Sequence, residues 1–300
     1  MKKKTYLFAL MTMVLTLGSC SDNENGIGGE TSKYITVSTS IGNMTRVATD
    51  VKGGQTFEEG DEISVYAWTG DATVAPETRE RVVNNAINKL TNGSWVATPQ
   101  MLWKNNRDKH YFIGVYPISA ISDLSAGEYT FDETKQVESD LLVAVNKDGL
   151  SYNVDEQQPV PLTFTHVMAK LVVNLTYKNQ WGGIPTVEKV VVGNAAKEAT
   201  INYLTKVVTP STTAKEDFSL PEITENTKYV SVIIPQEDVN QLTIVIGGKN
   251  FVYDNGTPFK LESGKITTVN LEVGRDEIKL GDVKITNWED GSTFSGEALN

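Results

Sequence analysis

Short stretches that alternate apolar and polar residues, each ended by Gly, Asn, Asp or Pro, run along most of this 300-residue chain. In one of them Ile63, Val65 and Ala67 alternate with Tyr66 and Trp68. A period of two residues is typical of β-strands with one buried face, whereas the helical period of 3.6 is nearly absent here. The alternation therefore predicts an all-β fold of the sandwich type.

The turn signals divide the chain into many short predicted strands. The sequence Asn92-Gly93 predicts a tight hairpin, because both turn positions need a positive φ. The longest strand signal, Leu162 to Tyr177, changes the parity of its apolar positions midway. This change predicts a bulge near His166 or burial of the strand on both faces. The other predicted strands cover residues 34–41, 63–68, 101–103, 111–116, 141–145, 187–192, 199–203, 229–234, 242–246, 265–273 and 278–287.

Two prolines, Pro159 and Pro161, mark the best candidate for a domain boundary, because proline is excluded from central strands. We therefore predict one domain over residues 34–158 and a second over residues 159–300. Each is long enough to bury a core of its own.

The amino terminus has the layout of a secretory signal over residues 1–19. Three lysines precede an apolar stretch over residues 6–17, which is shorter than the about 20 residues needed to cross a bilayer. The small pair Gly18-Ser19 stands directly before Cys20 and resembles the lipobox of bacterial lipoproteins. That resemblance implies cleavage before Cys20, acylation of this cysteine and anchoring in membrane lipid. The alternative is an ordinary signal peptide with a cysteine nearby.

Residues 20–33, which begin with the lipidated cysteine, form a predicted flexible linker because they are polar and rich in glycine. Within this linker, Ser21-Asp22-Asn23-Glu24 resembles the acidic tag that sends some lipoproteins to the outer face of the outer membrane. A plain solvated linker has the same composition, so both interpretations stay open.

Charge and cysteine content narrow the classes of partner. Removing residues 1–19 takes away three of the 27 basic residues and none of the 38 acidic ones, so the net charge goes from −11 to −14. This acidic excess argues against nucleic acid and anionic lipid surfaces as partners. Because Cys20 is the only cysteine, no disulfide can form once it carries lipid. Packed cores and backbone ladders must therefore stabilise the mature chain.

The chain offers no recognisable catalytic constellation. It has two histidines, His110 and His166, and neither a His-Glu-x-x-His zinc motif nor a Gly-x-Ser-x-Gly elbow nor a phosphate-binding loop. His166 lies in an apolar strand and is predicted to be structural. Acidic residues next to the turn glycine Gly60 predict a solvated loop; a calcium site is the alternative there, although the ligand spacing does not match a known loop. We expect no metal, no cofactor and no catalytic residues, and predict that the protein is not an enzyme.

Several short motifs succeed one another in a recognisable order and spacing. They are Tyr34 to Ile41 ahead of Thr45-Arg46; Phe57-Glu58-Glu59-Gly60-Asp61; Trp103 followed by Tyr111 to Pro117; Asp140-Leu141-Leu142-Val143-Ala144; Leu162-Thr163-Phe164-Thr165-His166 with Ala169-Lys170-Leu171; Ile234-Pro235-Gln236; and Ile285-Thr286-Asn287-Trp288. Together they resemble the fimbrillin-like pilins, the lipoprotein-derived subunits of type V pili. The resemblance covers nearly the whole mature chain and implies two transthyretin-like β-sandwiches in tandem.

The resemblance also implies a mode of assembly. In this family a strand near the amino terminus fills a sheet edge, a trypsin-like protease cuts after an arginine, and a strand of another subunit takes the vacated place. The matching positions are Arg46, with the scissile bond to Val47, and the plug residues Ile35, Val37 and Ile41. The implied partners are other pilin subunits, the maturation protease, outer-membrane lipid through Cys20 and a host or bacterial surface ligand. The implied locations are the cell outer membrane and, after maturation, the fimbrium.

Three questions stay open from the sequence. Arg46 could be an ordinary surface arginine after a permanently docked strand. Residues 278–285 could serve as the donor strand, although the polar tail after Gly291 offers few plugs. The alternative function is a surface lipoprotein that binds glycans through Trp68, Trp95 or Trp103, whose rings could stack on sugars.

Overall fold

The computed structural model describes residues 33–42, 56–153 and 158–288, and this part of the chain is all-β. Apart from strands it contains two single turns of 3-10 helix, Thr78–Glu80 and Asn179–Trp181. None of the described residues forms a helix long and apolar enough to cross a membrane. The predicted all-β class is therefore confirmed.

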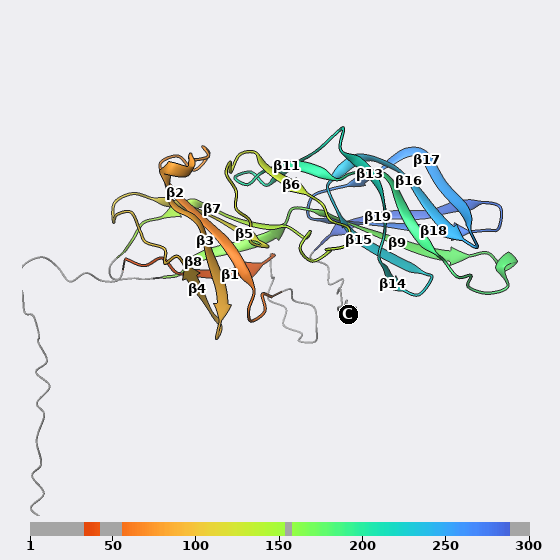
Figure 1. Ribbon diagram of the computed structural model, residues 1–300, viewed down its shortest axis with the longest axis horizontal. Coiled ribbons are helices and arrows are strands. Elements are labelled where there is room, and N and C mark those ends of the chain that lie inside the picture. Colours follow the sequence, from red (N-terminus) through yellow and green to blue (C-terminus); the bar gives the residue numbers. More distant parts are fainter. Residues whose placement is uncertain (1–32, 43–55, 154–157, 289–300) are drawn as a thin grey trace, which may run out of the picture. The chain divides into compact units, whose positions relative to one another are not determined.

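A seven-stranded sheet with the order β1-β8-β7-β5-β2-β3-β4 contains the first strand at one edge (Figure 1). All neighbouring strands in this sheet pair antiparallel except β1, which runs parallel to β8. Its strands are β1 (Val37–Ile41), β2 (Glu62–Thr69), β3 (Arg81–Thr91), β4 (Ser94–Thr98), β5 (His110–Tyr116), β7 (Leu142–Leu150) and β8 (Val160–His166).

Three further sheets contain the remaining strands. A four-stranded sheet has the order β13-β10-β16-β17, a five-stranded sheet the order β14-β15-β9-β18-β19, and a small sheet the order β12-β11-β6. Their bounds are β6 (Gly127–Thr130), β9 (Ala169–Tyr177), β10 (Lys189–Ala196), β11 (Glu198–Asn202), β12 (Val207–Pro210), β13 (Lys215–Ser219), β14 (Glu222–Thr224), β15 (Lys228–Ile233), β16 (Gln236–Ile246), β17 (Lys249–Leu261), β18 (Lys265–Val273) and β19 (Ile278–Asn287).

The hairpin predicted at Asn92-Gly93 is confirmed. Both residues have positive φ values, 51° and 73°, and they join β3 to β4 with Thr91 opposite Ser94. This backbone twist matches that of the flanking strands, which is why two-residue loops of this type connect hairpins.

The single long strand predicted over Leu162 to Tyr177 is wrong. The chain forms two strands here, β8 and β9, and they belong to different sheets. Val167 and Met168 separate them and are both buried, at 1% and 0% exposure. The change of parity in the sequence therefore marks a crossing from one sheet to the other, and the apolar run continues because the connection itself is buried.

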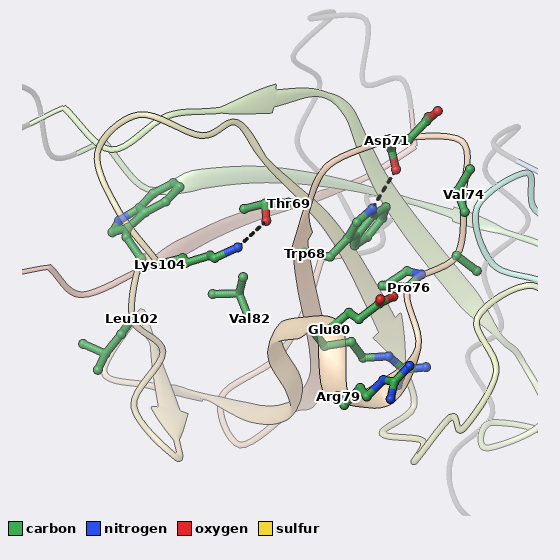
Figure 2. A pocket seen from close by; sticks show the side chains of 13 residues that line it. Trp68, Thr69, Asp71, Val74, Pro76, Arg79, Glu80, Val82, Leu102 and Lys104 are labelled. Atoms are coloured by element: carbon green, nitrogen blue, oxygen red, sulfur yellow. Dashed lines mark hydrogen bonds between the residues drawn. The ribbon is translucent and has the colours of Figure 1, made fainter.

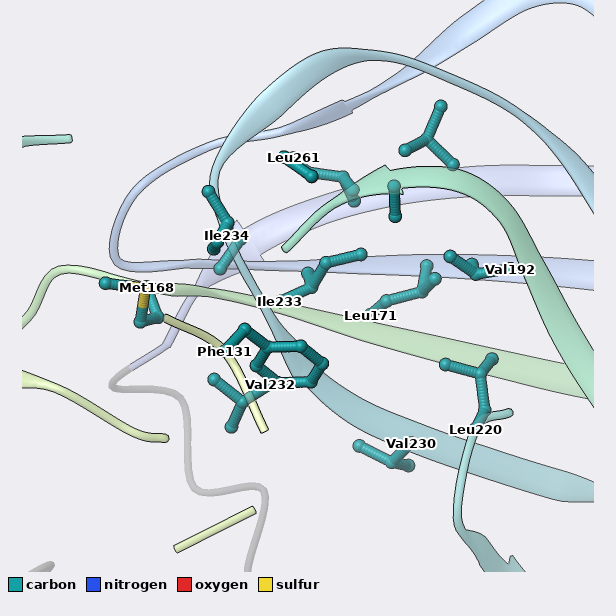
Figure 3. Close-up of a cluster of buried hydrophobic side chains, with 14 of the residues drawn as sticks. Phe131, Met168, Leu171, Val192, Leu220, Val230, Val232, Ile233, Ile234 and Leu261 are labelled. Atoms are coloured by element: carbon teal, nitrogen blue, oxygen red, sulfur yellow. The ribbon is translucent and has the colours of Figure 1, made fainter. Parts of the chain in front are cut away.

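The larger core cluster is built mainly from the four- and five-stranded sheets (Figure 3). It takes Val192 from β10, Leu171 from β9, and Val230 and Val232 from β15, and Phe131 and Met168 join it from connecting segments. All of these side chains are at least nine-tenths buried. At about 25 cal/mol for each Å² of apolar surface, such burial is the main term that stabilises a chain without disulfides.

Strand pairing crosses the boundary predicted between residues 158 and 159. β8 comes after this point but pairs with β7, which precedes it, from Leu142 opposite His166 to Ala144 opposite Phe164. Likewise β6 pairs with β11. The division into two domains at this position stays a prediction.

Candidate functional site

The first strand, β1, occupies the edge of the seven-stranded sheet, and among the residues that the structure describes its ladder partner is β8 alone (Figure 1). The parallel register runs from Val37 opposite Val160 to Ile41 opposite Phe164. Two more backbone bonds extend this ladder: Val160 donates to the Thr36 carbonyl at 2.8 Å and Gly42 donates to the Phe164 carbonyl at 2.8 Å. An edge strand held along one side can leave without breaking the ladders between the other strands.

The predicted plug residues point inward to different depths. Ile35 and Val37 are 1% and 6% exposed and belong to the smaller core cluster, whereas Ile41 is half-buried and packs against that cluster. The intervening residues Thr36 and Ser38 are exposed. This segment thus presents alternate apolar side chains to the sheet.

The floor beneath β1 consists of tightly packed residues from the central strands. The cluster contains Ile63, Val65, Phe112, Leu162 and Phe164, together with other buried side chains of β2, β3, β5, β7 and β8. Gly114 of β5 makes room for this packing, because a Cβ at that position would lie 2.7 Å from Cζ of Phe164. The floor would remain apolar if β1 departed.

Beyond β1 lies an open groove of about 680 Å³ between this strand and the β3–β4 hairpin. Trp95 lines it and donates a hydrogen bond from Nε1 to Oγ1 of Thr39 at 3.0 Å. Phe57 also lines it and makes edge-on contacts with the rings of Trp95 and Phe164, with centroids 5.3 and 5.1 Å away. Along Val37–Ile41 this side is therefore held by side chains, whereas the preceding residues form backbone bonds here: Ile35 donates to the Met101 carbonyl at 2.9 Å and Trp103 donates to the Lys33 carbonyl at 3.0 Å.

The acidic residues next to Gly60 lie in an exposed turn, as predicted, and two of them also accept hydrogen bonds from backbone amides. Glu59 accepts hydrogen bonds from the backbone amides of Asn92 and Gly93 at 2.7 and 3.4 Å, which fixes the tip of the β3–β4 hairpin. Asp61 accepts a bond from the Glu58 amide at 2.7 Å. Burial, together with the nearby Asp61 carboxylate, raises the pKa of Tyr116 to about 12.

Both histidines have structural partners. His110 is fully buried: its Nε2 accepts a bond from the Lys104 amide at 3.0 Å, and its Nδ1 lies 3.0 Å from the Asp108 carbonyl. The Nδ1 atom of His166 lies 2.8 Å from the Asp140 carboxylate, and its ring stacks on Trp288 with centroids 4.2 Å apart. These contacts explain why His166 can lie at the buried end of β8.

Acidification is expected to destabilise the protein through His110. Burial lowers the pKa of His110 below 6.5, so between the two pKa values the unfolded chain binds a proton that the folded chain does not. The free energy of unfolding should fall by up to about 1.4 kcal/mol for each pH unit below about 6.5. Urea unfolding at pH 7.5, 6.5 and 5.5 measures this loss. The dependence should weaken in His110→Gln; an equal slope in the wild type and this variant would contradict it.

The three tryptophans considered as stacking surfaces for sugar rings all make contacts within the protein. Trp68 is 2% exposed and donates from Nε1 to the Asp71 carbonyl at 2.9 Å, so its ring is part of the core. Trp95 is engaged with Thr39 through its Nε1 atom. Trp103 is half-buried and meets the rings of His110 and Phe112 edge-on.

Several predicted positions lie outside the described residues. These are Cys20, Arg46 and Val47, so lipidation and proteolytic maturation stay predictions. Within the described ranges, no group of three His, Cys, Asp or Glu side chains could hold a metal ion.

The fold and the edge strand define a class of protein: an all-β protein whose first described strand lies at the edge of a sheet and pairs there with β8. A sequence profile of the family described as Fimbrillin-like matches residues 45–288. The chain belongs to the fimbrillin-like family, and it is accordingly a structural protein rather than an enzyme.

Known relatives agree with this assignment. The chain is 29% identical over 182 residues to the "Putative fimbrium subunit Fim1C" of Bacteroides uniformis, and the match covers 58% of this chain and 56% of that relative. The chain therefore aligns with just over half the length of this relative.

Solved structures show the same fold at low identity. A "putative cell adhesion protein" from Bacteroides uniformis superposes with a TM-score of 0.64 at 19% identity, over 86% of this chain and all of that one. A second, from Bacteroides ovatus, gives 0.62 at 18% identity over 85% and 98% of the two chains. A fimbrial protein from Bacteroides vulgatus gives 0.52 at 11% identity over 84% and 99%.

Proposed function

We propose that this protein is a fimbrial subunit that is exported as an outer-membrane lipoprotein and polymerises by strand exchange, with two transthyretin-like sandwiches as its framework. Cleavage after Arg46 would separate β1 from the rest of the chain. A strand of another subunit would then pair with β8 and place its own side chains where Ile35 and Val37 lie. Lipid on Cys20 would hold the precursor at the cell surface until that step.

The observation that carries this proposal is the position of β1 at a sheet edge. If β1 lay between two strands, cleavage alone would not free it, but among the described residues Val37–Ile41 forms one ladder, with β8, and the backbone bonds on the other side are confined to the preceding residues, at Lys33 and Ile35. Burial of Ile35 and Val37 contributes about 1.5–3 kcal/mol each before ordering costs. Losing both without replacement would remove a large part of a domain's typical stability of about 5–15 kcal/mol. Exchange for another strand is therefore favoured over simple release.

The edge position and exposed apolar side chains of β19 support it as the donor strand in this exchange. β19 is an edge strand of the five-stranded sheet, and within the described ranges its one ladder partner is β18. Val283 and Ile285 are 40% and 39% exposed, so these apolar side chains are poorly buried where they are. In an acceptor groove the same side chains could be covered more completely.

Limited trypsin digestion of the protein that begins at Cys20 tests the proposal. We expect one early cut after Arg46, a new amino terminus at Val47 by mass spectrometry, and oligomers by size-exclusion chromatography. Arg46→Gln should remain uncut and monomeric, and Arg107→Gln, which changes an exposed loop arginine, should behave like the wild type. A trypsin-resistant monomer, or a cut chain that stays monomeric, would contradict the proposal.

A further inference from the structure

The outer edge of β1 carries backbone groups that have no strand partner. The Thr36 carbonyl and the Gly42 amide both bond to β8, so the backbone groups of the even-numbered residues of this segment point toward β8. Those of Val37, Thr39 and Ile41 therefore point away from it. Among the described strands none pairs with this edge, and the ladder with β8 has no register shift. The outer edge of β1 is thus a regular template for another strand.

The facing edge of β4 is unpaired in the same way. Leu90 of β3 directs its amide and carbonyl to residues 60 and 61, just before β2. Trp95 lies opposite Leu90 in the regular β3–β4 ladder, and the two therefore share no backbone bond. The amide and carbonyl of Trp95 point away from β3, and its side chain reaches Thr39 of β1. The groove thus lies between two sheet edges whose backbone groups lack strand partners within the described part of the chain.

The lining of this groove is neutral. Phe57, Leu90 and Trp95 supply much of its apolar part, and the hydroxyl groups of Ser and Thr residues supply its polar part. None of the described lining residues is charged, although 22% of the residues in the chain are. Burying a charged side chain without a partner is costly, so the groove favours an uncharged strand face.

A cleft of about 770 Å³ beside Val82 differs in this respect. Figure 2 shows Asp71, Arg79, Glu80 and Lys104 around it. An apolar strand would remove water from these charged groups, which opposes binding. Of these two spaces, the groove is the one that suits an apolar strand.

β1 is held less firmly at the Ile41 end, beside the groove, than at the Ile35 end. Around Ile35 the chain has backbone bonds on both sides, from Ile35 to Met101 and from Thr36 to Val160. Ile35 is 1% exposed, whereas Ile41 is half-buried and lines the groove. If β1 is displaced step by step, it should therefore loosen first at Ile41.

The apolar face of β19 fits the neutral groove. Val283 and Ile285 are 40% and 39% exposed, and their spacing of two residues places them on one face of the strand, with Lys284 on the other. In the groove this face would meet the rings of Phe57 and Trp95, while Lys284 would stay in water. The two apolar side chains would be better covered there than in their own sheet.

We propose that this groove is where β19 of a second copy first binds, beside β1, before it displaces β1 from Ile41 toward Ile35. Its backbone would pair with the outward groups of Thr39 and Ile41, and Val283 and Ile285 would lie on the apolar side chains of the groove. Each apolar side chain of β1 would then leave as another takes its place. This inference rests on the proposed function, to which it adds the first step of strand exchange.

The rate of exchange tests this order of events. The protein that begins at Cys20 is cut with trypsin at nanomolar concentration, the trypsin is inhibited, and a fluorescent peptide with the sequence of residues 278–288 is added in excess. Anisotropy follows its uptake. If the peptide binds before β1 leaves, the observed rate should rise about tenfold over a tenfold range of peptide concentration. If β1 must leave first, the rate should not change with peptide concentration.

Ser94→Tyr places a large side chain in the groove without removing a backbone bond of β4. It should slow the exchange about tenfold, within the range by which association rates vary among variants of one interface, and leave the final anisotropy unchanged. Val96→Tyr is the matched control, because Val96 is an exposed residue of the same strand that does not line the groove. Both variants should unfold in urea like the wild type. A peptide with Val283→Ser and Ile285→Ser should also exchange more slowly.

The other outcomes separate this inference from the proposed function. Uptake at a rate that does not depend on peptide concentration would overturn the docking step and leave strand exchange intact. Oligomers of the cut protein without uptake of the peptide would mean that another strand is the donor, which also overturns the inference. Equal rates in Ser94→Tyr and Val96→Tyr would assign the first contact to another surface. Neither uptake nor oligomers would contradict the proposed function and the inference together.

Discussion

Replacing Ile35 by alanine is expected to lower the free energy of unfolding by about 2–5 kcal/mol, the range for truncating a buried isoleucine. Ile35 is 1% exposed and lies in the segment before β1. Its backbone amide donates a hydrogen bond to the Met101 carbonyl. Its loss removes an anchor of the plug and leaves a cavity above the sheet. Urea unfolding of the uncut protein measures the loss directly.

The neighbouring Thr36 provides the control, because it lies on the same strand segment but is exposed. Thr36→Ala should change the free energy of unfolding by no more than about 0.5 kcal/mol. If β1 is the exchanged strand, Ile35→Ala should also form oligomers faster than the wild type after trypsin treatment. Equal stability of the two variants would show that Ile35 does not fasten the strand.

Replacing Trp288 by alanine is expected to cost about 3–5 kcal/mol of unfolding free energy, the usual range for a buried tryptophan. Trp288 directly follows β19 and is 4% exposed. Its ring stacks on His166, and Nζ of Lys170 lies 4.8 Å from its centroid. Burial lowers the pKa of Lys170 to about 8, so the ammonium group depends on favourable neighbours such as this ring.

Trp288→Phe separates the aromatic contact from mere volume. Phenylalanine keeps a ring for His166 and Lys170, and it also removes an Nε1 that is buried without a hydrogen-bond partner among the described residues. We expect it to retain more than half of the stability lost in Trp288→Ala. Thermal and urea unfolding of the three proteins provide the comparison. If alanine and phenylalanine destabilise equally, the stacking contact does not hold the end of β19.

Local sequence was sufficient where apolar and polar residues alternate along a strand and turn residues mark its ends. The bounds of β18 and β19, residues 265–273 and 278–287, match the predicted strands, and Asn92-Gly93 specified its hairpin. In these elements the period of two and the turn residues act in the same direction. A strand can be predicted from sequence where these local signals agree.

Where burial is two-sided or a strand is very short, the sequence signal failed. Val167 and Met168 continue an apolar run through a connection between sheets, so the sheet change could not be separated from a bulge. β6 contains only Gly127-Glu128-Tyr129-Thr130, too few residues to show a period. β17 includes Asn255-Gly256 and Pro258, which are typical of a turn, although paired residues on both sides place them in one strand.

One part of the candidate site could likewise be predicted from the sequence, and another part could not. The alternation of Ile35, Val37 and Ile41 identified the inward face of β1, because it is a property of one short segment. The end of β4 opposite Ile87 and the pairing of Leu102 with Tyr34 could not be foreseen. The predicted strand at residues 101–103 is a single bridge in the structure. Such pairing depends on the register between distant segments, which no local pattern encodes.

A genetic crossover between residues 158 and 159 would part strands that need each other. β7 would come from one parent and β8 from the other, and the same would hold for β6 and β11. In a chimera, two strand pairings would have to form between sequences from different parents before the hydrophobic cores could pack. Shuffling of halves between related genes should therefore yield few stable subunits, and diversity is expected to accumulate in exposed loops instead.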